Sequence, residues 1–409
     1  MTSLPAPAST APTPTLSEQR AILFVASVQF VNILDFMMVM PLGPDFSRGL
    51  GIPLSQLPII GGSYTGAACV SGLVGALFLD RFDRRPALFL AMCGLFLGTV
   101  SGAFAQGLGS LVAARVLAGI FGGPATSLSL GILADAVPPQ RRGKAMGTVM
   151  GAFAASSVLG VPFGLELARR FSWRAPFWAV GILGAIIAAL VFTLMPPMRK
   201  HLDGEKQAPP SLFAMLRGDT LVSLTLSVVA FGAAFMVVPS ISGYLTANLG
   251  YPREHLWMLY MAGGTVSFFT TRIGGRMVDR FGSAITGSAG TVVVALVVFT
   301  MFVRVPPTVP IFVGFIGFML GMGLRNVSVT SLSSKVPRPA ERARFGSLQS
   351  AAQHFASFLG ALASSRFLSE RPDHTLAGMD QVALASIGLS ALVLPLLFTL
   401  ERRLRGRAQ

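Results

Sequence analysis

Long apolar stretches separated by short polar turns run through almost the whole chain. A helix that crosses the roughly 30 Å hydrocarbon core of a membrane needs about 20 mostly apolar residues. In the first half, such stretches lie near residues 21–41, 57–79, 86–106, 109–136, 145–168 and 175–196. In the second half, they lie near residues 219–247, 255–278, 284–303, 308–334, 344–367 and 379–400. The pattern therefore predicts an all-α integral membrane protein with twelve transmembrane helices.

The polar segments divide this helical region into two parts. The longest interruption falls near the middle of the chain, and we interpret residues 198–217 as a cytoplasmic linker between six-helix bundles at 20–197 and 218–402. Residues 1–19 are rich in Pro, Ala, Ser and Thr and lack an apolar core, which predicts a disordered cytoplasmic tail rather than a signal peptide. Residues 403–409 are expected to form a second cytoplasmic tail.

The composition agrees with a membrane protein and changes the meaning of the charge. Of the 409 residues, 52% are hydrophobic and only 12% are charged, against about 25% in soluble domains. A net charge of +15 would suggest nucleic-acid binding in a soluble protein. Here the predicted loops place 22 of the 32 Lys and Arg residues on the side of the two termini and 8 on the other side. Because basic loops face the cytoplasm, we expect both termini to be cytoplasmic, in a bacterial inner membrane, with the lipid bilayer and no nucleic acid as partner.

The two halves carry an internal repeat. GALFLDRFD in the first half matches GGRMVDRFG in the second, so that Asp80 and Arg81 align with Asp279 and Arg280 at an offset of 199 residues. Both copies fall in the turn after the second helix of their half. Two parallel copies of one six-helix unit predict a duplicated transporter, with pseudo-symmetric bundles around a central cavity.

These motifs resemble the major facilitator superfamily. Its loop signature GxLxDRxGRR is similar to ALFLDRFDRR at residues 76–85, where Ala76 and Asp83 replace the two glycines. Three further stretches resemble the twelve-helix drug/proton antiporter branch of arabinose-efflux-like permeases: NILDFMMVMPLGPDF at 32–46, RVLAGIFGG at 115–123 and GAFAASSVLGVPFG at 151–164. The resemblance implies transport by alternating access, with no cofactor.

Two charges of the first half fall inside predicted helices. A carboxylate at mid-helix costs roughly 2.5 to 3.5 kcal/mol on insertion scales, so Asp35 indicates a function, which we expect to be binding and release of a proton. Arg115 cannot lose its charge. The resemblance implies that it assists proton transfer, and we expect it to pair with Asp35 directly or through water. The alternatives are structural: a protonated Asp35 bonded to a neighbouring helix, and an Arg115 that bonds only helix carbonyls.

Other polar and aromatic residues at membrane depth are candidates for a substrate cavity. Gln29 and Asn32 share one stripe of helix 1 with Asp35. His354 is a candidate for a second protonation step, with a simply hydrogen-bonded histidine as the alternative. For the aromatic candidates, the alternative to lining a cavity is that the side chain faces lipid. The whole set is Gln29, Asn32, Phe36, Tyr64, Phe235, Arg325, Asn326, Gln353 and His354.

The repeated turns are candidates for a conformational latch. Their acids can accept backbone N–H groups at a neighbouring helix N-terminus or pair with arginines. The resemblance implies that such contacts latch the outward-facing state, and an ordinary charged loop is the alternative. The latch residues are Asp80, Arg81, Arg84, Asp135, Asp279 and Arg280.

Helix 5 carries the antiporter-like motif, formed by Gly151, Gly160, Pro162 and Gly164. Pro162 cannot donate to the carbonyl four residues earlier, which predicts a bend. The resemblance implies that this bend seals the two halves in one state; ordinary helix packing is the alternative. Glu166 is expected to pair with Arg169 or Arg170 rather than to carry protons.

The chain contains no GxxxxGK[ST], HExxH or GxSxG motif, and Cys69 and Cys93 have no metal-ligand spacing. We therefore expect no metal and no enzyme, but a monomeric proton-coupled antiporter that exports drugs or metabolites and can confer multidrug resistance. A proton symporter or uniporter for a sugar or other small metabolite stays open, because Val161 separates Gly160 from Pro162. A transport-inactive receptor or scaffold is a remote alternative.

Overall fold

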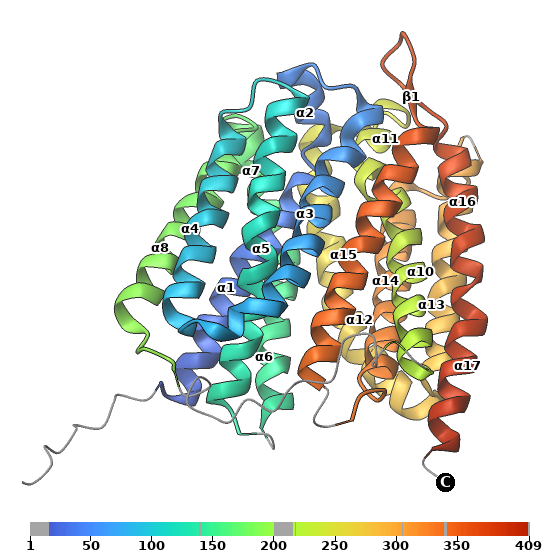
Figure 1. The fold of residues 1–409 in the computed structure, drawn as a ribbon. Helices are drawn as coiled ribbons and strands as arrows, with labels where there is room; N and C mark the ends of the chain where they lie inside the picture. The colour runs from blue at the N-terminus through green and yellow to red at the C-terminus, as the bar shows by residue number, and fades with distance from the viewer. Residues whose placement is uncertain are drawn as a thin grey trace, which may run out of the picture.

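The computed structural model describes residues 16–138, 141–199, 216, 218–304, 306–338 and 342–407, most of which lie in helices (Figure 1). The first half contains α1 (Glu18–Val39), α2 (Gly43–Leu50), η1 (Leu54–Gln56), α3 (Leu57–Phe78), η2 (Leu79–Arg81), α4 (Arg84–Ala103), α5 (Leu108–Ala136), α6 (Arg142–Ala155), η3 (Ser156–Gly160), α7 (Val161–Arg170) and α8 (Ala175–Leu194). The second half contains α10 (Asp219–Val237), η5 (Val238–Ser240), α11 (Ile241–Ala247), η6 (Arg253–His255), α12 (Leu256–Phe281), α13 (Ser283–Val298), η7 (Phe299–Val303), α14 (Ile311–Ser333), α15 (Arg342–Phe367), β1 (Ser369–Glu370), β2 (Leu376–Ala377), α16 (Met379–Ala391) and α17 (Val393–Gly406).

Several neighbouring elements are continuous, so each predicted membrane helix has a counterpart among the described residues. The joined elements are α6–η3–α7, α10–η5–α11, α13–η7 and α16–α17. Within the described part of the chain, ten segments are long and apolar enough to cross a membrane. α12 and α15 are as long, with 26 residues each, but carry more polar and charged side chains. The all-α membrane fold with two helical halves is confirmed.

The ends of the helical region differ slightly from the prediction. α1 begins at Glu18, two residues inside the predicted N-terminal tail. α17 continues to Gly406, through most of the predicted C-terminal tail, and Arg403 and Arg407 pair with Asp219 at the start of α10 (N–O 3.6 and 2.8 Å). These ion pairs hold the end of the chain against the start of the second half. The predicted linker falls largely outside the described residues.

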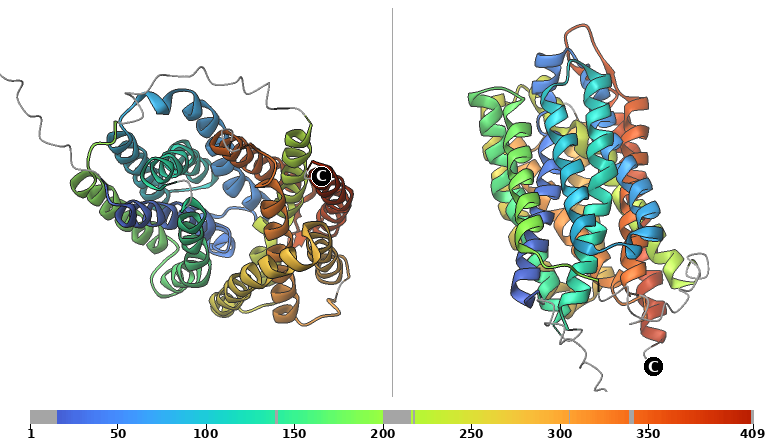
Figure 2. Two further views of the ribbon diagram at one scale, coloured as in Figure 1. Left: turned by 90° about the horizontal axis from the view of Figure 1, so that it is seen from below. Right: turned by 60° about the vertical axis from the view of Figure 1, so that its left-hand side comes forward.

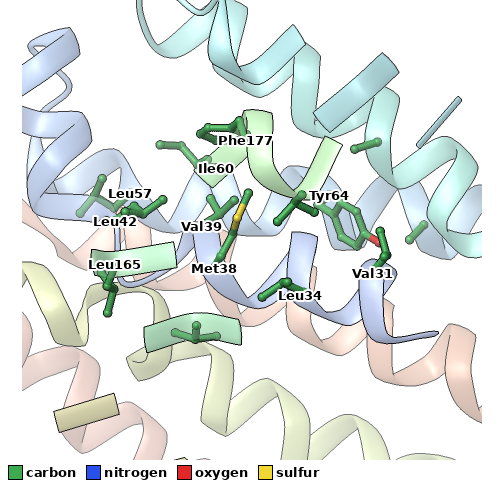
Figure 3. Packing of buried hydrophobic residues seen from close by; sticks show 14 of the residues in the cluster. Val31, Leu34, Met38, Val39, Leu42, Leu57, Ile60, Tyr64, Leu165 and Phe177 are labelled. Atoms are coloured by element: carbon green, nitrogen blue, oxygen red, sulfur yellow. The ribbon is translucent and has the colours of Figure 1, made fainter. Parts of the chain in front are cut away.

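The two halves lie side by side as separate groups of helices (Figure 2). α1 begins and α17 ends on the same side of the molecule, which we call the terminal face (Figure 1). α2 and the hairpin β1–β2 lie on the opposite side, which we call the loop face (Figure 1). Buried apolar side chains of α1, α3 and α8, among them Met38, Ile60 and Phe177, fill the space between the helices of the first half (Figure 3).

The repeated turn is built in two different ways. In the second half, Gly282 alone separates α12 from α13 and has φ +89°, a conformation that residues with a Cβ rarely adopt. In the first half the equivalent residue is Asp83, with φ −57°, and its carboxylate accepts a hydrogen bond from the backbone N–H of Arg85 (3.0 Å). The replacement of glycine by aspartate thus exchanges a tight turn for a capped helix start.

Candidate functional site

A buried ion pair joins two helices of the first half. Arg115 on α5 donates from Nη1 and Nη2 to the two carboxylate oxygens of Asp35 on α1, at 3.0 Å each. Nη2 also donates to the backbone carbonyl of Asp35 at 3.3 Å. Asp35 is 0% and Arg115 is 1% exposed. The pairing expected from the sequence is a direct, bidentate ion pair. Loss of either side chain would leave the charge of the other buried without a counter-charge.

Two further side chains complete the surroundings of this pair. The Oγ1 of Thr99, on α4, lies 2.7 Å from Oδ1 of Asp35 and 2.8 Å from the carbonyl oxygen of Leu95. The ring of Tyr64, on α3, lies against the guanidinium of Arg115, with its centroid 4.7 Å from Cζ. This cation–π contact stabilises the positive charge of Arg115.

A chain of hydrogen bonds continues from Tyr64 into the bundle. The Tyr64 hydroxyl donates to Oδ1 of Asn32 (2.6 Å), and Nδ2 of Asn32 donates to the Gly122 carbonyl (3.0 Å) and to Oγ1 of Thr126 (2.7 Å). The Thr126 hydroxyl donates in turn to Oε1 of Gln29 (3.4 Å). The predicted polar stripe of helix 1 is therefore one end of a network that spans α1, α3 and α5. Sequence reasoning missed the threonines, because an uncharged hydroxyl in an apolar helix is commonly satisfied by its own helix.

Three aromatic candidates meet where the two halves contact each other. The ring centroid of Phe36 on α1 lies 5.3 Å from that of Tyr64 on α3 and 5.9 Å from that of Phe235 on α10. Phe36 and Phe235 are only partly buried. The structure thus brings together rings from both halves, and one of them, Phe36, directly follows Asp35 in the sequence.

The polar candidates of the second half are not joined to this network. Arg325 on α14 is 0% exposed, and its contacts are Oγ of Ser390 (3.4 Å) and Sδ of Met322 (2.8 Å). Among the described residues no carboxylate pairs with it. Asn326 and His354 are partly buried, and no described side-chain hydrogen bond links them to Asp35.

Gln353, the neighbour of His354 on α15, is also partly buried, and its backbone carbonyl accepts the hydroxyl of Ser357 (2.8 Å). Within the part of the chain that the structure describes, no group of three or more His, Cys, Asp or Glu residues could hold a metal ion.

In the first half, Arg84 joins the start of α4 to the end of α5, donating from Nε to Oδ2 of Asp135 at 3.2 Å. Arg81 is exposed, and the side chain of Asp80 lies outside what the structure describes. The neighbouring acid, Asp83, was not among the candidates. Desolvation opposes its ionisation, but the backbone N–H groups of Met198 and Arg85 and the guanidinium of Arg199 together lower the pKa of Asp83 below its ordinary value.

The turn of the second half lies at the start of α13. Asp279 and Arg280 are both exposed, and Arg280 lies over the ring of Phe281, 5.2 Å from its centroid. The N-terminus of α13 is occupied by Glu401 of α17, whose Oε2 accepts the backbone N–H of Ala284 at 2.7 Å. The start of α13 is thus bound by an acid of α17, and the latch role of Asp279 stays a prediction.

The helix 5 motif packs against α1. One residue separates the π-helical turn η3 from Pro162, and the bend predicted at Pro162 stays a prediction. Ser156 donates from Oγ to the carbonyl oxygen of Phe30 at 3.1 Å. A methyl group on Gly160 would lie 2.6 Å from Cδ1 of Leu34, so this glycine permits the close approach of the two helices.

The opposite side of η3 contacts the second half. A methyl group on Gly264 of α12 would lie 2.6 Å from the carbonyl oxygen of Ser157. Gly151 has no atom within 4 Å of the equivalent position, and a methyl on Gly164 would make only ordinary contacts at 3.8 Å. The tight contact of this segment with the second half is thus at Gly264, which lies outside the motif.

At the end of this segment, Glu166 accepts hydrogen bonds from Arg169 (2.6 and 2.7 Å) and from Arg170 (2.6 Å). The expectation that Glu166 pairs with these arginines is confirmed.

Polar contacts join the two halves on the loop face. Arg253 of η6 donates to both carboxylate oxygens of Asp45 on α2, with N–O distances of 2.6 to 3.0 Å. Their side chains are 8% and 17% exposed. The backbone N–H of Leu54 donates to Oε2 of Glu370 on β1 at 2.6 Å.

A third contact is made by the hydroxyl of Ser242 on α11, which donates to the carbonyl oxygen of Met40 at 3.0 Å. These three contacts each join a residue of the first half to a residue of the second half on the loop face. The loop face is therefore closed. The sequence offered no signal for these pairs beyond the presence of charges in loops.

The sequence profile of the Major Facilitator Superfamily matches residues 25–361. The chain belongs to the major facilitator superfamily. It is accordingly a multi-pass membrane transporter and not an enzyme. The resemblance drawn from the motifs of its loops and helices is confirmed.

Relatives within the superfamily are distant. The chain is 28% identical over 274 residues to an uncharacterized transporter YbcL of Bacillus subtilis, covering 66% of this chain and 69% of that one. It is 29% identical over 287 residues to a chloramphenicol resistance protein of Streptomyces lividans, with the same coverage. Across the curated relatives compared, the matched part ranges from 34% to 69% of the relative's length.

A solved structure extends the comparison of the fold to almost the whole chain. It is a bacterial homologue of the human lysosomal transporter Spinster in an inward-facing, occupied conformation, with a TM-score of 0.76 and 16% identity. The match covers 96% of this chain and 98% of the other. At this identity the likeness establishes the superfamily fold.

Proposed function

We propose that this transporter is a proton-coupled antiporter that exports small organic molecules across the bacterial inner membrane by alternating access. The observation that carries the proposal is the fully buried pair of Asp35 and Arg115, next to aromatic rings contributed by both halves. An intramembrane acid in contact with a fixed cation is a group whose protonation changes the local charge and weakens the attraction between the helices that carry the two groups. That change is what couples a proton to a conformational cycle.

The charge distribution supports the direction of transport. The basic residues lie mainly on the terminal face, which we assign to the cytoplasm. With the loop face closed, substrate would enter from the cytoplasmic side. Opening toward the outside requires the loop-face contacts to break, while Arg84 and Asp135 remain candidates for the latch of that second state.

Proton binding supplies the switch in this scheme. Protonation of Asp35 leaves Arg115 without its counter-charge, so the attraction between α1 and α5 weakens. The Tyr64 ring and the Asp35 backbone carbonyl still contact the guanidinium, which keeps Arg115 in place during the neutral phase. Release of the proton to the cytoplasm restores the pair and completes the exchange.

The lining supports an apolar or aromatic substrate. Phe36 contacts both Tyr64 and Phe235, so the three rings form one aromatic group between the halves, and hydrophobic and aromatic side chains predominate in sites for drug-sized molecules. The chloramphenicol resistance relative points in the same direction. We therefore select chloramphenicol as the first probe. As a separate proposal, we expect the protein to act as a monomer.

Transport by purified protein in proteoliposomes tests the proposal. With an imposed pH gradient, chloramphenicol or a member of a metabolite panel should move against the proton flux, and Asp35→Asn should stop gradient-driven movement. The conservative control is Glu166→Gln, which removes a carboxylate on the loop face outside the proposed pathway. Full gradient-driven transport by Asp35→Asn would refute the coupling role. Movement of substrate together with protons would establish the symporter alternative, and specific binding without flux over the whole panel would establish the receptor alternative.

A further inference from the structure

We propose that Thr99 is a positioning residue, which assigns the transported proton to the oxygen Oδ1 of Asp35 and stabilises both protonation states of that carboxyl. The inference rests on the proposed coupling role of Asp35 and adds the atom at which the proton binds. Thr99 is 1% exposed and lies on α4, a helix that contributes no other polar contact to the ion pair among the described residues.

The geometry gives the Thr99 hydroxyl two acceptors but only one proton to donate. Its Oγ1 lies 2.7 Å from Oδ1 of Asp35 and 2.8 Å from the carbonyl oxygen of Leu95, one turn earlier on the same helix. A hydroxyl carries one donor and two acceptor lone pairs, so it can donate to only one of these oxygens at a time. When Asp35 is ionised, the charged oxygen is the stronger acceptor and takes the bond.

Protonation reverses this bond without displacing a heavy atom. A proton delivered by water bonds to Oδ1 at the lone pair that faces Thr99, and the new O–H of Asp35 then donates to Oγ1. The Thr99 hydroxyl turns to donate to the Leu95 carbonyl. The Nη1 of Arg115 keeps the other lone pair of Oδ1, and Nη2 keeps Oδ2, so one proton is gained and neither hydrogen bond to the guanidinium is broken.

The other oxygen of the carboxyl is a poorer site for the proton. Oδ2 accepts from Nη2 of Arg115, and no hydroxyl of the described residues donates to it, so it has no counterpart of Thr99 that can turn from donor to acceptor. Because Asp35 is 0% exposed, a buried O–H is favourable only where it meets an acceptor, and Thr99 supplies one at Oδ1. The other titratable group beside the pair is Tyr64 on α3, whose hydroxyl donates to Asn32. The other polar side chains of α1 in this network, Gln29 and Asn32, are neutral amides.

An infrared titration of the purified protein reads the protonation of this carboxyl directly and needs no substrate. The carbonyl band of the protonated acid is assigned by its absence in Asp35→Asn. Thr99→Val keeps the shape but removes the hydroxyl, so the ionised form loses a charge-assisted bond and the protonated form loses a weaker, neutral one. The midpoint should therefore move to higher pH by about one unit, a tenfold change in proton concentration. Thr99→Ser keeps the hydroxyl and should titrate as the wild type does. The pH profile of chloramphenicol transport should shift in parallel.

Thr291→Val is the matched control. Thr291 on α13 is also buried, at 2% exposure, and also bonds a carbonyl one turn earlier, that of Gly287 at 2.8 Å, but no carboxylate is bound to it. This variant should leave the midpoint unchanged. If Thr99→Val does not fold, Thr99→Cys, with a weak S–H donor, should give a smaller shift in the same direction.

A Thr99→Val protein that titrates at the wild-type pH would overturn the positioning role and leave the coupling role of Asp35 intact. If the wild-type protein has no titrating band that Asp35→Asn removes, both proposals are overturned.

Discussion

The ion pair between Arg253 and Asp45 joins the two halves on the loop face, and its removal should shift the balance between conformational states. The pair has three N–O contacts of 2.6 to 3.0 Å and is largely shielded from water, with side-chain exposures of 8% and 17%. Hydrogen bonds to charged groups of this kind contribute about 1.5 to 3 kcal/mol. At about 1.4 kcal/mol for each factor of ten, a loss of about 2 kcal/mol would favour the loop-open state roughly thirtyfold.

Distances between spin labels across the loop face measure this shift. In a cysteine-free background, labels at the exposed positions Gln106 and Pro372 report the separation of the two halves. Asp45→Asn should broaden the distribution of label distances and add a longer distance. The reason is that the ion pair with Arg253 forms only in the closed state, so its loss destabilises that state alone.

Two variants make the interpretation decisive. The double variant Asp45→Arg with Arg253→Asp restores an ion pair with the two charges exchanged. It should recover most of the population with the short label distance. Glu166→Gln removes an ion pair on the same face but within one half, and should leave the distances unchanged. Unaltered distances in Asp45→Asn would refute the reasoning that this pair closes the loop face.

Three further predictions concern stability and packing. Asp35→Asn leaves Arg115 buried and unpaired and should lower the free energy of unfolding by about 3 to 5 kcal/mol; chemical denaturation in detergent should show partial recovery when Arg115→Gln is added, and equal stability of single and double variants would contradict the prediction. Because the pKa of Asp83 is lowered, its stabilising contribution is present above the ordinary aspartate pKa and is lost as the pH falls through the folded-state value, so the difference in melting temperature between wild type and Asp83→Asn should disappear in acid. Gly264→Val should separate the halves and lengthen the loop-face distances, whereas Gly275→Val on the same helix, with open space around it, should not; equal effects of the two would contradict close packing at Gly264.

The sequence determined the helices and their division into two halves. Inside a membrane every backbone polar group must be bonded within the chain, so an apolar stretch of sufficient length has few alternatives to a helix. The same solvent makes charges rare, which is why Asp35 and Arg115 were visible as candidates without any structure. Their pairing could be predicted, because two opposite charges buried in one bundle are stable chiefly when they meet.

The tertiary structure alone decided which neutral groups join this pair and which charges connect the halves. Thr99 contacts Asp35, 64 residues away, and Arg253 contacts Asp45, 208 residues away, and neither pair has a spacing that periodicity could reveal. The repeat predicted similar turns in the two halves, but in the second half Glu401 of the last helix accepts the backbone N–H of Ala284 at the start of α13. Such contacts depend on where helices cross and how they are rotated about their axes. These quantities are set by the packing of small residues such as Gly160 and Gly264 against distant backbone and side chains, so they are not fixed by the local hydrophobic pattern.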